Sequence, residues 1–305
     1  MKKRLLCIVN PIAGSGNGKQ VAGIIRHGLD AGKYDFSLCF TEYPGHAREL
    51  ARQAAADGVD VVVAVGGDGT VNETASGLVG SQTALAIVPR GSGNGLAFHL
   101  GMPHNIRRDL AIINQGHVVR IDTATINGRP FFCTCGVGYD AKVAMDYAQA
   151  GTRGLITYLK KIVENLDGYV PQRFRIATDT DSFETRAFLI TCGNANQWGN
   201  HCHITPEASL RDGLLDLTIL RPFNLLEAAP MAVQLFDFHI YKSHKAESFR
   251  SSRFVISHLE ETPGAKSQIE AHLDGEAFFS DPTLEIVCVP ESLNVVVPVG
   301  GSRPL

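Results

Sequence analysis

Four short, almost continuously apolar segments alternate with helical patterns in the first part of the chain. They are residues 5–10 (LLCIVN), 36–41 (FSLCFT), 59–65 (VDVVVAV) and 84–89 (ALAIVP). Strands without polar alternation are typical of a parallel sheet that is covered on both faces. The segments GHARELARQAAADG and TVNETASGLVG between them have helical patterns. This alternation predicts right-handed β–α–β crossovers and a doubly wound α/β domain over residues 1–122.

The pattern changes after residue 122. Short segments of alternating or β-branched character follow, at residues 130–138, 173–179, 183–192, 214–220, 253–257, 267–276 and 284–290. Helical patterns interrupt them at residues 152–166 and 224–240. A run of strands after an α/β unit predicts a second, largely antiparallel β domain over residues 123–291. The tail, residues 292–305, contains the strand-like segment LNVVVPV, which either returns to the first domain or belongs to the second.

Composition excludes several classes of protein. A chain of 305 residues with 44% hydrophobic and 19% charged residues is typical of a globular protein with two domains. Its net charge of -3 provides no basic field for nucleic acid. Seven scattered cysteines without a secretory start indicate a reducing compartment, and we expect a cytoplasmic protein. No run of 18 apolar residues occurs, so we expect any membrane contact to be peripheral.

Three glycine-rich segments follow predicted strands: NPIAGSGNGK (residues 10–19), GGDGTVNE (66–73) and PRGSGNG (89–95). We call them the first, second and third glycine corners. In an open α/β sheet such corners gather at the carboxyl ends of the strands, where ligands bind. Glycine allows the main chain to approach an anion closely. Neither the Walker A pattern nor the Gly-x-Gly-x-x-Gly fingerprint is satisfied, because Ala13 and Lys19 stand where each requires glycine.

Asp68 is unexpected in a phosphate-binding corner, because a carboxylate repels phosphate unless a cation lies between them. Mg²⁺ commonly bridges one or two carboxylates and nucleotide phosphates. Asp68 therefore indicates a magnesium-bound nucleotide. The structural alternative is an Asx-type helix cap.

The three corners together resemble the diacylglycerol kinase catalytic-domain superfamily, which includes bacterial diacylglycerol kinases and other lipid kinases, sphingosine kinases and ceramide kinases. The resemblance continues in GVGYDAKV (136–143), TPEASLRDGLLDLTIL (205–220) and LDGE (273–276), in the expected order. It implies a Rossmann-like nucleotide domain, a C-terminal β-sandwich and an active site in the cleft between them. It also implies ATP and Mg²⁺ as cofactors.

The resemblance further implies roles for particular residues. Glu276 matches a proposed general base, and in some relatives Asp68 is the proposed base instead. A structural magnesium site is implied at Asp212, with the carbonyl groups of Ser209 and Leu214. The implied nucleotide-binding residues are Asn10, Pro11, Ile12, Ala13, Gly14, Thr41, Gly66, Gly67, Asp68, Gly69, Thr70, Val71, Asn72, Glu73 and Ser92.

The acceptor stays open at this level. GSGNGLA resembles the sphingosine kinase form more than the diacylglycerol kinase form, but it belongs to a nucleotide corner. Diacylglycerol and sphingoid or ceramide-type lipids both remain. The rival functions are an NAD kinase-like enzyme, a soluble-alcohol kinase and a non-catalytic nucleotide-binding regulator. Retention of both Asp68 and Glu276 disfavours the last. The oligomeric state, monomer or homodimer, also stays open.

Residues 224–240 are apolar over much of the predicted helix, with Met231, Leu235, Phe236 and Phe238 among them. The following segment carries Lys242, Lys245, Arg250 and Arg253. Apolar residues beside cations fit a peripheral contact with an anionic membrane. The alternative is a helix packed in the core, followed by a solvated strand edge. His201 and His203 have no second ligand pair at zinc spacing, so we expect a loop rather than a metal site there.

Overall fold

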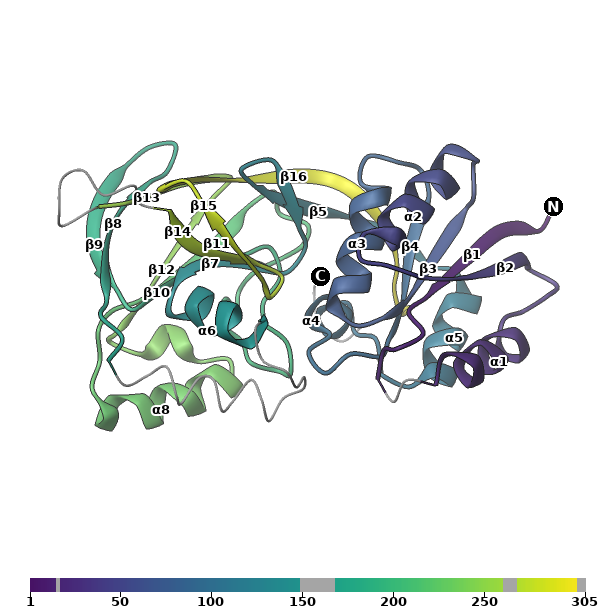
Figure 1. The fold of residues 1–305 in the computed structure, drawn as a ribbon, viewed down its shortest axis with the longest axis horizontal. Coiled ribbons are helices and arrows are strands. Elements are labelled where there is room, and N and C mark those ends of the chain that lie inside the picture. Colours follow the sequence, from purple (N-terminus) through teal and green to yellow (C-terminus); the bar gives the residue numbers. More distant parts are fainter. Residues whose placement is uncertain (15–16, 149–167, 260–267, 301–305) are drawn as a thin grey trace. The chain divides into compact units, whose positions relative to one another are not determined.

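The computed structural model describes residues 1–14, 17–148, 168–259 and 268–300 (Figure 1). The chain divides into two compact units. The first contains Met1–Thr123 and Pro290–Leu305, and the second contains Ala124–Val289. The helical pattern at residues 152–166 lies outside the described residues.

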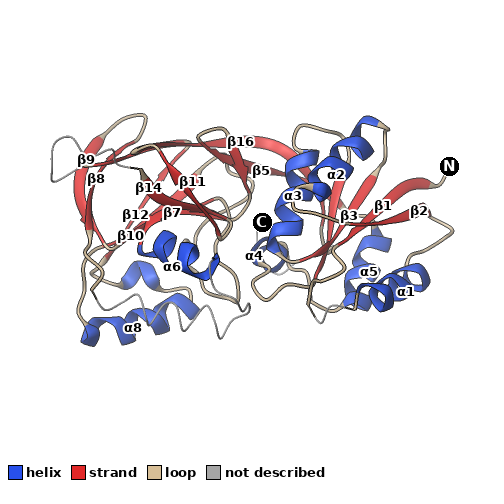
Figure 2. Ribbon diagram, viewed as in Figure 1, coloured by secondary structure: helices blue, strands red, loops and turns tan. Residues whose placement is uncertain are grey.

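The N-terminal unit is built on a parallel sheet (Figure 2). Its strands are, in order across the sheet, β2 (Tyr34–Phe40), β1 (Lys3–Val9), β3 (Val61–Gly66) and β4 (Ala84–Pro89). Every residue of β3 and β4 is buried, as expected of central strands covered on both faces. This confirms the predicted α/β domain.

Helices cover both faces of this sheet. They are α1 (Gly18–Gly28), α2 (His46–Ala56), α3 (Asp68–Leu78), α4 (Gly95–His99) and α5 (Ile106–Gln115). Successive strand residues face opposite ways, so Cys7 joins Ile25 of α1 and Leu110 of α5 in one apolar core, while Ile8 lies on the other face. Figure 1 shows α1 and α5 on one side of the sheet and α2 and α3 on the other.

The second unit contains two antiparallel sheets that share one core, as predicted for its class. The six-stranded sheet has the order β12 (Ala246–Ser251), β11 (Leu215–Leu220), β10 (Leu189–Gly193), β7 (Thr134–Gly138), β14 (Ile269–Leu273) and β15 (Glu276–Ser280). The facing strands belong to the ten-stranded sheet that β16 joins to β4, and they are β5 (Val118–Ile126), β6 (Arg129–Phe131), β8 (Gln172–Ala177), β9 (Ser182–Ala187), β13 (Arg253–His258) and β16 (Thr283–Val296). Fully buried Phe131, Phe174 and Phe254 lie in the apolar cluster between the sheets.

Several predicted strands are divided differently in the structure: residues 130–138 form β6 and β7, and residues 267–276 form β14 and the start of β15. Residues 183–192 were expected as one strand, but the chain divides at Phe188 into β9 and β10, which belong to different sheets. The segments 284–290 and 293–299 were expected as separate strands, but β16 is continuous through most of both. Its first half pairs with β13, and Asn294 and Val295 pair with β4. The tail therefore returns to the N-terminal unit.

Two helices pack against the six-stranded sheet of the second unit. These are α6 (Tyr139–Ala148) and α8 (Leu225–Phe236), which is followed by the short 3-10 helix η1 (Ile240–Lys242). Val143, Met231 and Ile240 share a second apolar cluster with Phe188 and Leu220. None of the helices that the structure describes is long and apolar enough to cross a bilayer.

Candidate active site

Hydrogen bonds join the first glycine corner to the second. Asn10 follows β1, and its amide donates to the carbonyl of Val65 at 3.0 Å. Its side-chain amide donates to the Thr70 hydroxyl at 3.1 Å. Gly14 has a φ of 65°, which lets the first corner turn close to the third. A Cβ at Gly14 would lie only 2.9 Å from the carbonyl oxygen of Arg90.

The second and third corners are in direct contact. The amide of Arg90 donates to the carbonyl of Gly66 at 2.7 Å. A Cβ atom at Gly91 would lie 2.6 Å from the Cα of Gly67, a distance that main-chain atoms cannot accommodate. The glycines therefore serve the approach of the corners to each other, and they leave no side chain between them. The structure thus brings the three corners together at one edge of the sheet.

Asp68 links the second corner to the third. Its carboxylate accepts hydrogen bonds from the amides of Asn94 at 2.8 Å and Gly95 at 2.9 Å. Asn94 is left-handed, with a φ of 52°, and α4 begins at the next residue. Gly93 is required because a Cβ there would lie 2.7 Å from an Asp68 carboxylate oxygen. Asp68 therefore caps the start of a neighbouring helix.

The electrostatic environment of Asp68 has two opposing parts. Burial raises the pKa of its carboxyl group, and the amides of Asn94, Gly95 and Asp68 itself act in the opposite direction. Each carboxylate oxygen can accept more than one hydrogen bond, so both retain capacity after binding the two amides. Mg²⁺ usually keeps several of its waters and needs only one or two carboxylates. Asp68 is therefore compatible with a hydrated magnesium ion on a nucleotide.

Other predicted nucleotide-binding residues take different places. The Thr41 amide donates to the carbonyl of Val9 at 2.9 Å, so Thr41 lies beside the first corner. The Glu73 carboxylate accepts the amides of Gly45 and Ala47 at 2.8 and 3.2 Å, which caps the start of α2. Glu73 therefore stabilises the packing of α2 on α3.

The remaining residues of the corners divide by exposure. The side chains of Val71 and Asn72 are buried, whereas Ile12 and Ser92 are exposed. The Ser92 hydroxyl makes no hydrogen bond with a residue that the structure describes. Ser92 is therefore the polar side chain that the third corner presents outward.

Arg90 is a candidate that sequence reasoning missed. A Cβ at Gly14 would lie 3.3 Å from its guanidinium, so this cation lies against the turn of the first corner. Its buried Nε has no hydrogen-bond partner among the described residues. A guanidinium group is well suited to phosphate oxygens. The signal in the sequence is an arginine between Pro89 and Gly91, inside a glycine-rich segment that follows a predicted strand.

In the second unit, Glu276 begins β15 directly after a tight hairpin turn. The turn residues Asp274 and Gly275 have positive φ angles of 46° and 82°, as an Asp-Gly hairpin turn requires. Glu276 is exposed. The candidate general base thus lies on a short, regular hairpin with a fixed register, in which it pairs with Leu273.

Asp274 fixes this hairpin to the start of β7, and sequence reasoning missed its role. Its carboxylate accepts three main-chain amides, from Phe132 at 2.9 Å, Cys133 at 2.7 Å and Thr134 at 3.1 Å. Hydrogen bonds to a carboxylate are among the stronger ones in proteins. Asp274 is therefore a positioning residue for Glu276.

A second buried carboxylate joins α6 to the six-stranded sheet. Asp140 accepts a hydrogen bond from the Thr191 hydroxyl at 2.6 Å, and His272 Nε2 lies 3.0 Å from the same oxygen. Gly136 lies between Thr191 and His272 in the sheet, and a Cβ there would lie 2.6 Å from that oxygen. The absence of a side chain at Gly136 therefore leaves room for the Asp140 carboxylate against the sheet.

The Asp212 carboxylate, part of the implied structural magnesium site, is bound by two groups of the second unit. One Asp212 oxygen accepts the Leu214 amide at 3.0 Å, and the other is paired with the guanidinium of Arg250. The same guanidinium lies 3.3 Å from Asp216. Burial raises the pKa of Asp216 to about 6, while Arg250 lowers it. The Arg250 guanidinium thus pairs with both carboxylates, and the magnesium site at Ser209, Asp212 and Leu214 stays a prediction.

The apolar helix of the second unit is exposed on one side only. Met231 is buried, and Leu235 packs against the same cluster, as the core-packing alternative requires. Leu226, Val233 and Phe236 are 88%, 64% and 56% exposed. Their spacing places them on one face of α8, which we call the exposed α8 face.

The cations that follow α8 are mostly paired within the fold. Lys245 pairs with Glu227, Arg250 with Asp212, and Arg253 with Glu285. Lys242 makes no ion pair with a described residue, and its ammonium lies 5.9 Å from the Tyr241 ring.

No metal cluster forms at His201 and His203. Among the described residues, no group of three or more potential side-chain ligands is suitable for a metal ion. His203 is buried and stacks on Phe238 at 3.4 Å between ring centroids. Both histidines lie in the irregular segment between β10 and β11, as expected for a loop.

Comparisons with known proteins agree with the fold. Residues 4–126 match the diacylglycerol kinase catalytic domain, and residues 133–297 match the YegS C-terminal NAD kinase beta sandwich-like domain. An uncharacterized protein of Synechocystis is 27% identical over 308 residues, covering 97% of this chain and 70% of that protein. A diacylglycerol kinase of Bacillus subtilis is 28% identical over 302 residues, with 97% of each chain covered. A crystal structure of a proposed diacylglycerol kinase from Bacillus anthracis has a TM-score of 0.81 at 24% identity, covering 97% of this chain and 95% of that one.

Proposed function

Because the chain belongs to the diacylglycerol kinase catalytic-domain family of lipid kinases, which uses ATP, we propose that it transfers the γ-phosphoryl group of ATP to a lipid hydroxyl group. The observation that carries this proposal is the Asp68 carboxylate, which holds two of the three glycine corners together. Phosphoryl transfer requires aligned phosphates, a metal and an oriented hydroxyl more than covalent chemistry from the protein.

We assign different roles to the two candidate acids. Asp68 accepts the amides of Asn94 and Gly95, so it positions the corners, and it would help to hold a hydrated Mg²⁺. When bound, the metal neutralises charge on the phosphates. Glu276 is exposed at the start of a hairpin, and we propose that its carboxylate takes the proton from the acceptor hydroxyl. General-base catalysis typically contributes about 10²–10⁴-fold to the rate.

The assignment of Glu276 is tested by Glu276→Gln. We expect kcat to fall by about 10²-fold or more, while ATP binding is unchanged, because the amide keeps the shape but cannot take a proton. The assay is transfer of labelled phosphate from ATP to lipid, with ATP affinity measured by calorimetry. Glu207→Gln, at an exposed position of the same unit, is the matched control. Near-normal turnover in Glu276→Gln would remove Glu276 from the mechanism.

The acceptor that we propose is a membrane lipid, either diacylglycerol or a sphingoid or ceramide-type lipid. The exposed α8 face supports this choice, because Leu226, Val233 and Phe236 form an apolar stripe on the surface of the described protein. The unpaired Lys242 lies in the segment that follows and would favour anionic lipid. We propose that this face provides a peripheral contact with the bilayer.

The membrane contact can be tested by vesicle co-sedimentation. We expect the double variant Leu226→Ser and Val233→Ser to bind vesicles at least about tenfold more weakly, since burial of each side chain contributes about 1.5–3 kcal/mol. Val299→Ser removes a similarly exposed side chain from the N-terminal unit and is the control. Equal sedimentation of all three proteins would exclude this face as the contact.

The principal rival is an NAD kinase-like activity, because the C-terminal domain family is described as NAD kinase beta sandwich-like. The catalytic-domain match over residues 4–126 favours the lipid branch instead. Labelled ATP offered with mixed lipid vesicles, with NAD and with glycerol separates the lipid, NAD and soluble-alcohol hypotheses. Labelled product in the lipid phase supports the proposal, and product only from NAD or glycerol refutes it.

A further inference from the structure

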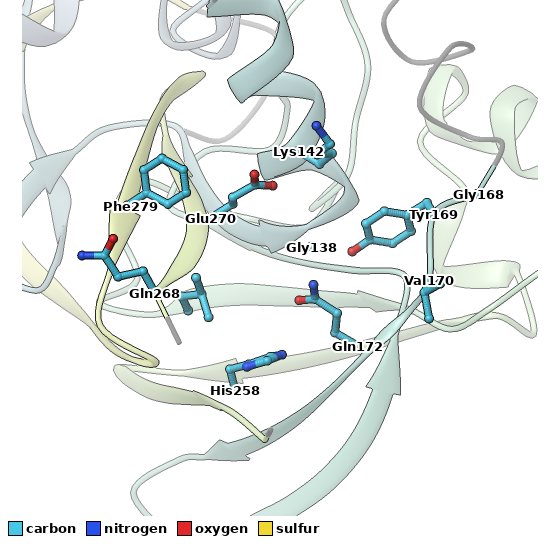
Figure 3. Close-up of a pocket in the computed structure, with 11 residues that line it drawn as sticks. Gly138, Lys142, Gly168, Tyr169, Val170, Gln172, His258, Gln268, Glu270 and Phe279 are labelled. Atoms are coloured by element: carbon cyan, nitrogen blue, oxygen red, sulfur yellow. The ribbon is translucent and has the colours of Figure 1, made fainter. Parts of the chain in front are cut away.

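A cavity of about 600 Å³ opens beside α6 in the second unit (Figure 3). Its walls come from α6, from the segment before β8, from the end of β13 and from the hairpin of β14 and β15. The volume is typical of small-molecule sites. The lining residues that matter below are Lys142, Tyr169, Val170, Ile269, Glu270 and Phe279. Neither the predicted nucleotide-binding residues nor Glu276 belongs to this wall.

Among the residues of this wall that the structure describes, the charge without an ionic partner is negative. The Lys142 ammonium is 2.8 Å from both carboxylate oxygens of Asp146, one turn along α6, so this pair is neutral. Glu270 makes no hydrogen bond or ion pair with any residue that the structure describes. The outward alternation of β14 explains its position: Ile269 and Ala271 enter the core, while Glu270 points to the α6 side. A carboxylate that has no partner among the described residues and lies in a partly enclosed wall favours a cation.

Tyr169 adds an unpartnered polar group to the same wall. Its ring makes edge contacts with Tyr139 and Phe188 at centroid distances of 5.1 and 5.3 Å. Its hydroxyl is buried and has no hydrogen-bond partner among the described residues. Burial raises the pKa of this hydroxyl, and the negative charges of Asp140 and Glu270 raise it further. The electrostatic potential at the hydroxyl is therefore negative, which agrees with the unpaired negative charge of Glu270 among the described residues of the cavity.

The rest of the wall combines the apolar side chains of Val170, Ile269 and Phe279 with the polar side chains of Gln172, His258 and Gln268. Val170 and Phe279 are 64% and 57% exposed, and Ile269 closes the base from β14. We propose that this cavity binds an organic ammonium ion with a short alkyl body. Its ammonium group pairs with Glu270 and donates to the Tyr169 hydroxyl, and its alkyl part contacts Val170 and Phe279. This proposal does not depend on the proposed phosphotransfer, because the site requires only residues of the second unit.

The proposal predicts a charge preference at constant ligand size. Hexylammonium, 1-hexanol and hexanoate are titrated separately into the full-length protein by calorimetry at neutral pH. We expect hexylammonium to bind at least about tenfold more tightly than hexanol, and hexanoate not to bind measurably. In Glu270→Gln the advantage of the ammonium over the alcohol should disappear. Glu207→Gln has the same change of net charge at an exposed site and should retain the advantage.

A second variant separates binding from folding. Tyr169→Phe removes a hydroxyl that has no partner within the described fold, so its melting temperature should be equal to or above that of the wild type. Hexylammonium affinity should nevertheless fall severalfold. Equal affinity for hexylammonium and hexanol in the wild type, or an unchanged preference in Glu270→Gln, would overturn the proposal. Neither result would bear on lipid phosphorylation, which is assayed independently with labelled ATP.

Discussion

Asp109 should make the stability of the N-terminal unit depend strongly on pH. It lies in the first turn of α5 with 0% exposure, and neither carboxylate oxygen has a hydrogen-bond partner among the described residues. Burial raises its pKa from 3.8 to about 7, although the amide of Asn105 and the guanidinium of Arg90 act in the opposite direction. The perturbation that tests this is Asp109→Asn, which keeps the shape and removes the titration.

The sign and the magnitude follow from linkage. Because the folded pKa is above the unfolded pKa, the folded state binds the proton more tightly, and stability is lost as pH rises from about 4 to about 7. A shift of about three units corresponds to about 4 kcal/mol in all. Between about pH 5 and pH 8 the wild type should therefore lose about 3 kcal/mol from this group. Asp109→Asn carries a buried amide whose cost is the same at both pH values, so only its slope is diagnostic.

The assay is urea unfolding at several pH values, together with hydrogen exchange of the α5 amides. The quantity compared is the difference between wild type and Asp109→Asn, because Asp68 and Asp216 also have raised pKa values in both proteins. Asp35→Asn, at an exposed position of β2, is the matched control and should follow the wild type. If wild type and Asp109→Asn show the same change between about pH 5 and pH 8, the buried carboxyl is not the titrating group.

Three further predictions concern the carboxylates of Asp68, Asp274 and Asp212. Asp68→Asn leaves the amide of Asn94 or Gly95 without an acceptor, so the free energy of unfolding should fall by about 2–3 kcal/mol, and ATP affinity should also fall. An unchanged urea midpoint and an unchanged calorimetric ATP affinity would contradict the role of Asp68 in joining the two corners. Asp274→Asn loosens the hairpin that carries Glu276, so kcat should fall while the KM for ATP changes little. An effect on KM alone would exclude this role. Nucleotide-free wild type should melt at the same temperature with Mg²⁺ or EDTA, whereas Arg250→Gln should gain thermal stability from Mg²⁺; a magnesium-dependent wild type would support the metal site at Asp212.

The fold was predictable where local pattern is sufficient. Uninterrupted apolar residues in β3 and β4 predict buried parallel strands, and both strands appear with nearly the expected bounds. The pattern of residues 183–192 does not reveal a change of sheet at Phe188, because each half has the composition of a strand. The apolar surface of α8 extends too far round the helix for sequence to separate buried Met231 from exposed Val233.

The site was predictable as a set of corners and unpredictable as a set of contacts. Glycines after strand ends predict the meeting of the corners, because parallel strands end at one edge. The partners of the carboxylates lie far away in sequence. Asp274 accepts amides about 140 residues earlier, and Arg250 reaches Asp212 across 38 residues. No local spacing encodes such pairs, so the sequence did not predict the partner of Asp212 or the place of Arg90 beside the first corner.

The distribution of hydrogen bonds bears on which acid accepts the proton. Asp68, Glu73 and Asp274 are all acids in the sequence motifs, and each uses its carboxylate on main-chain amides at the start of another element. An acid fixed in this way has its carboxylate oxygens bound to the main chain of another element. Glu276 is exposed and belongs to the hairpin that Asp274 anchors. The motif LDGE therefore contains both the proposed base, Glu276, and the residue that anchors its hairpin, Asp274. This arrangement favours Glu276 over Asp68 as the proton acceptor.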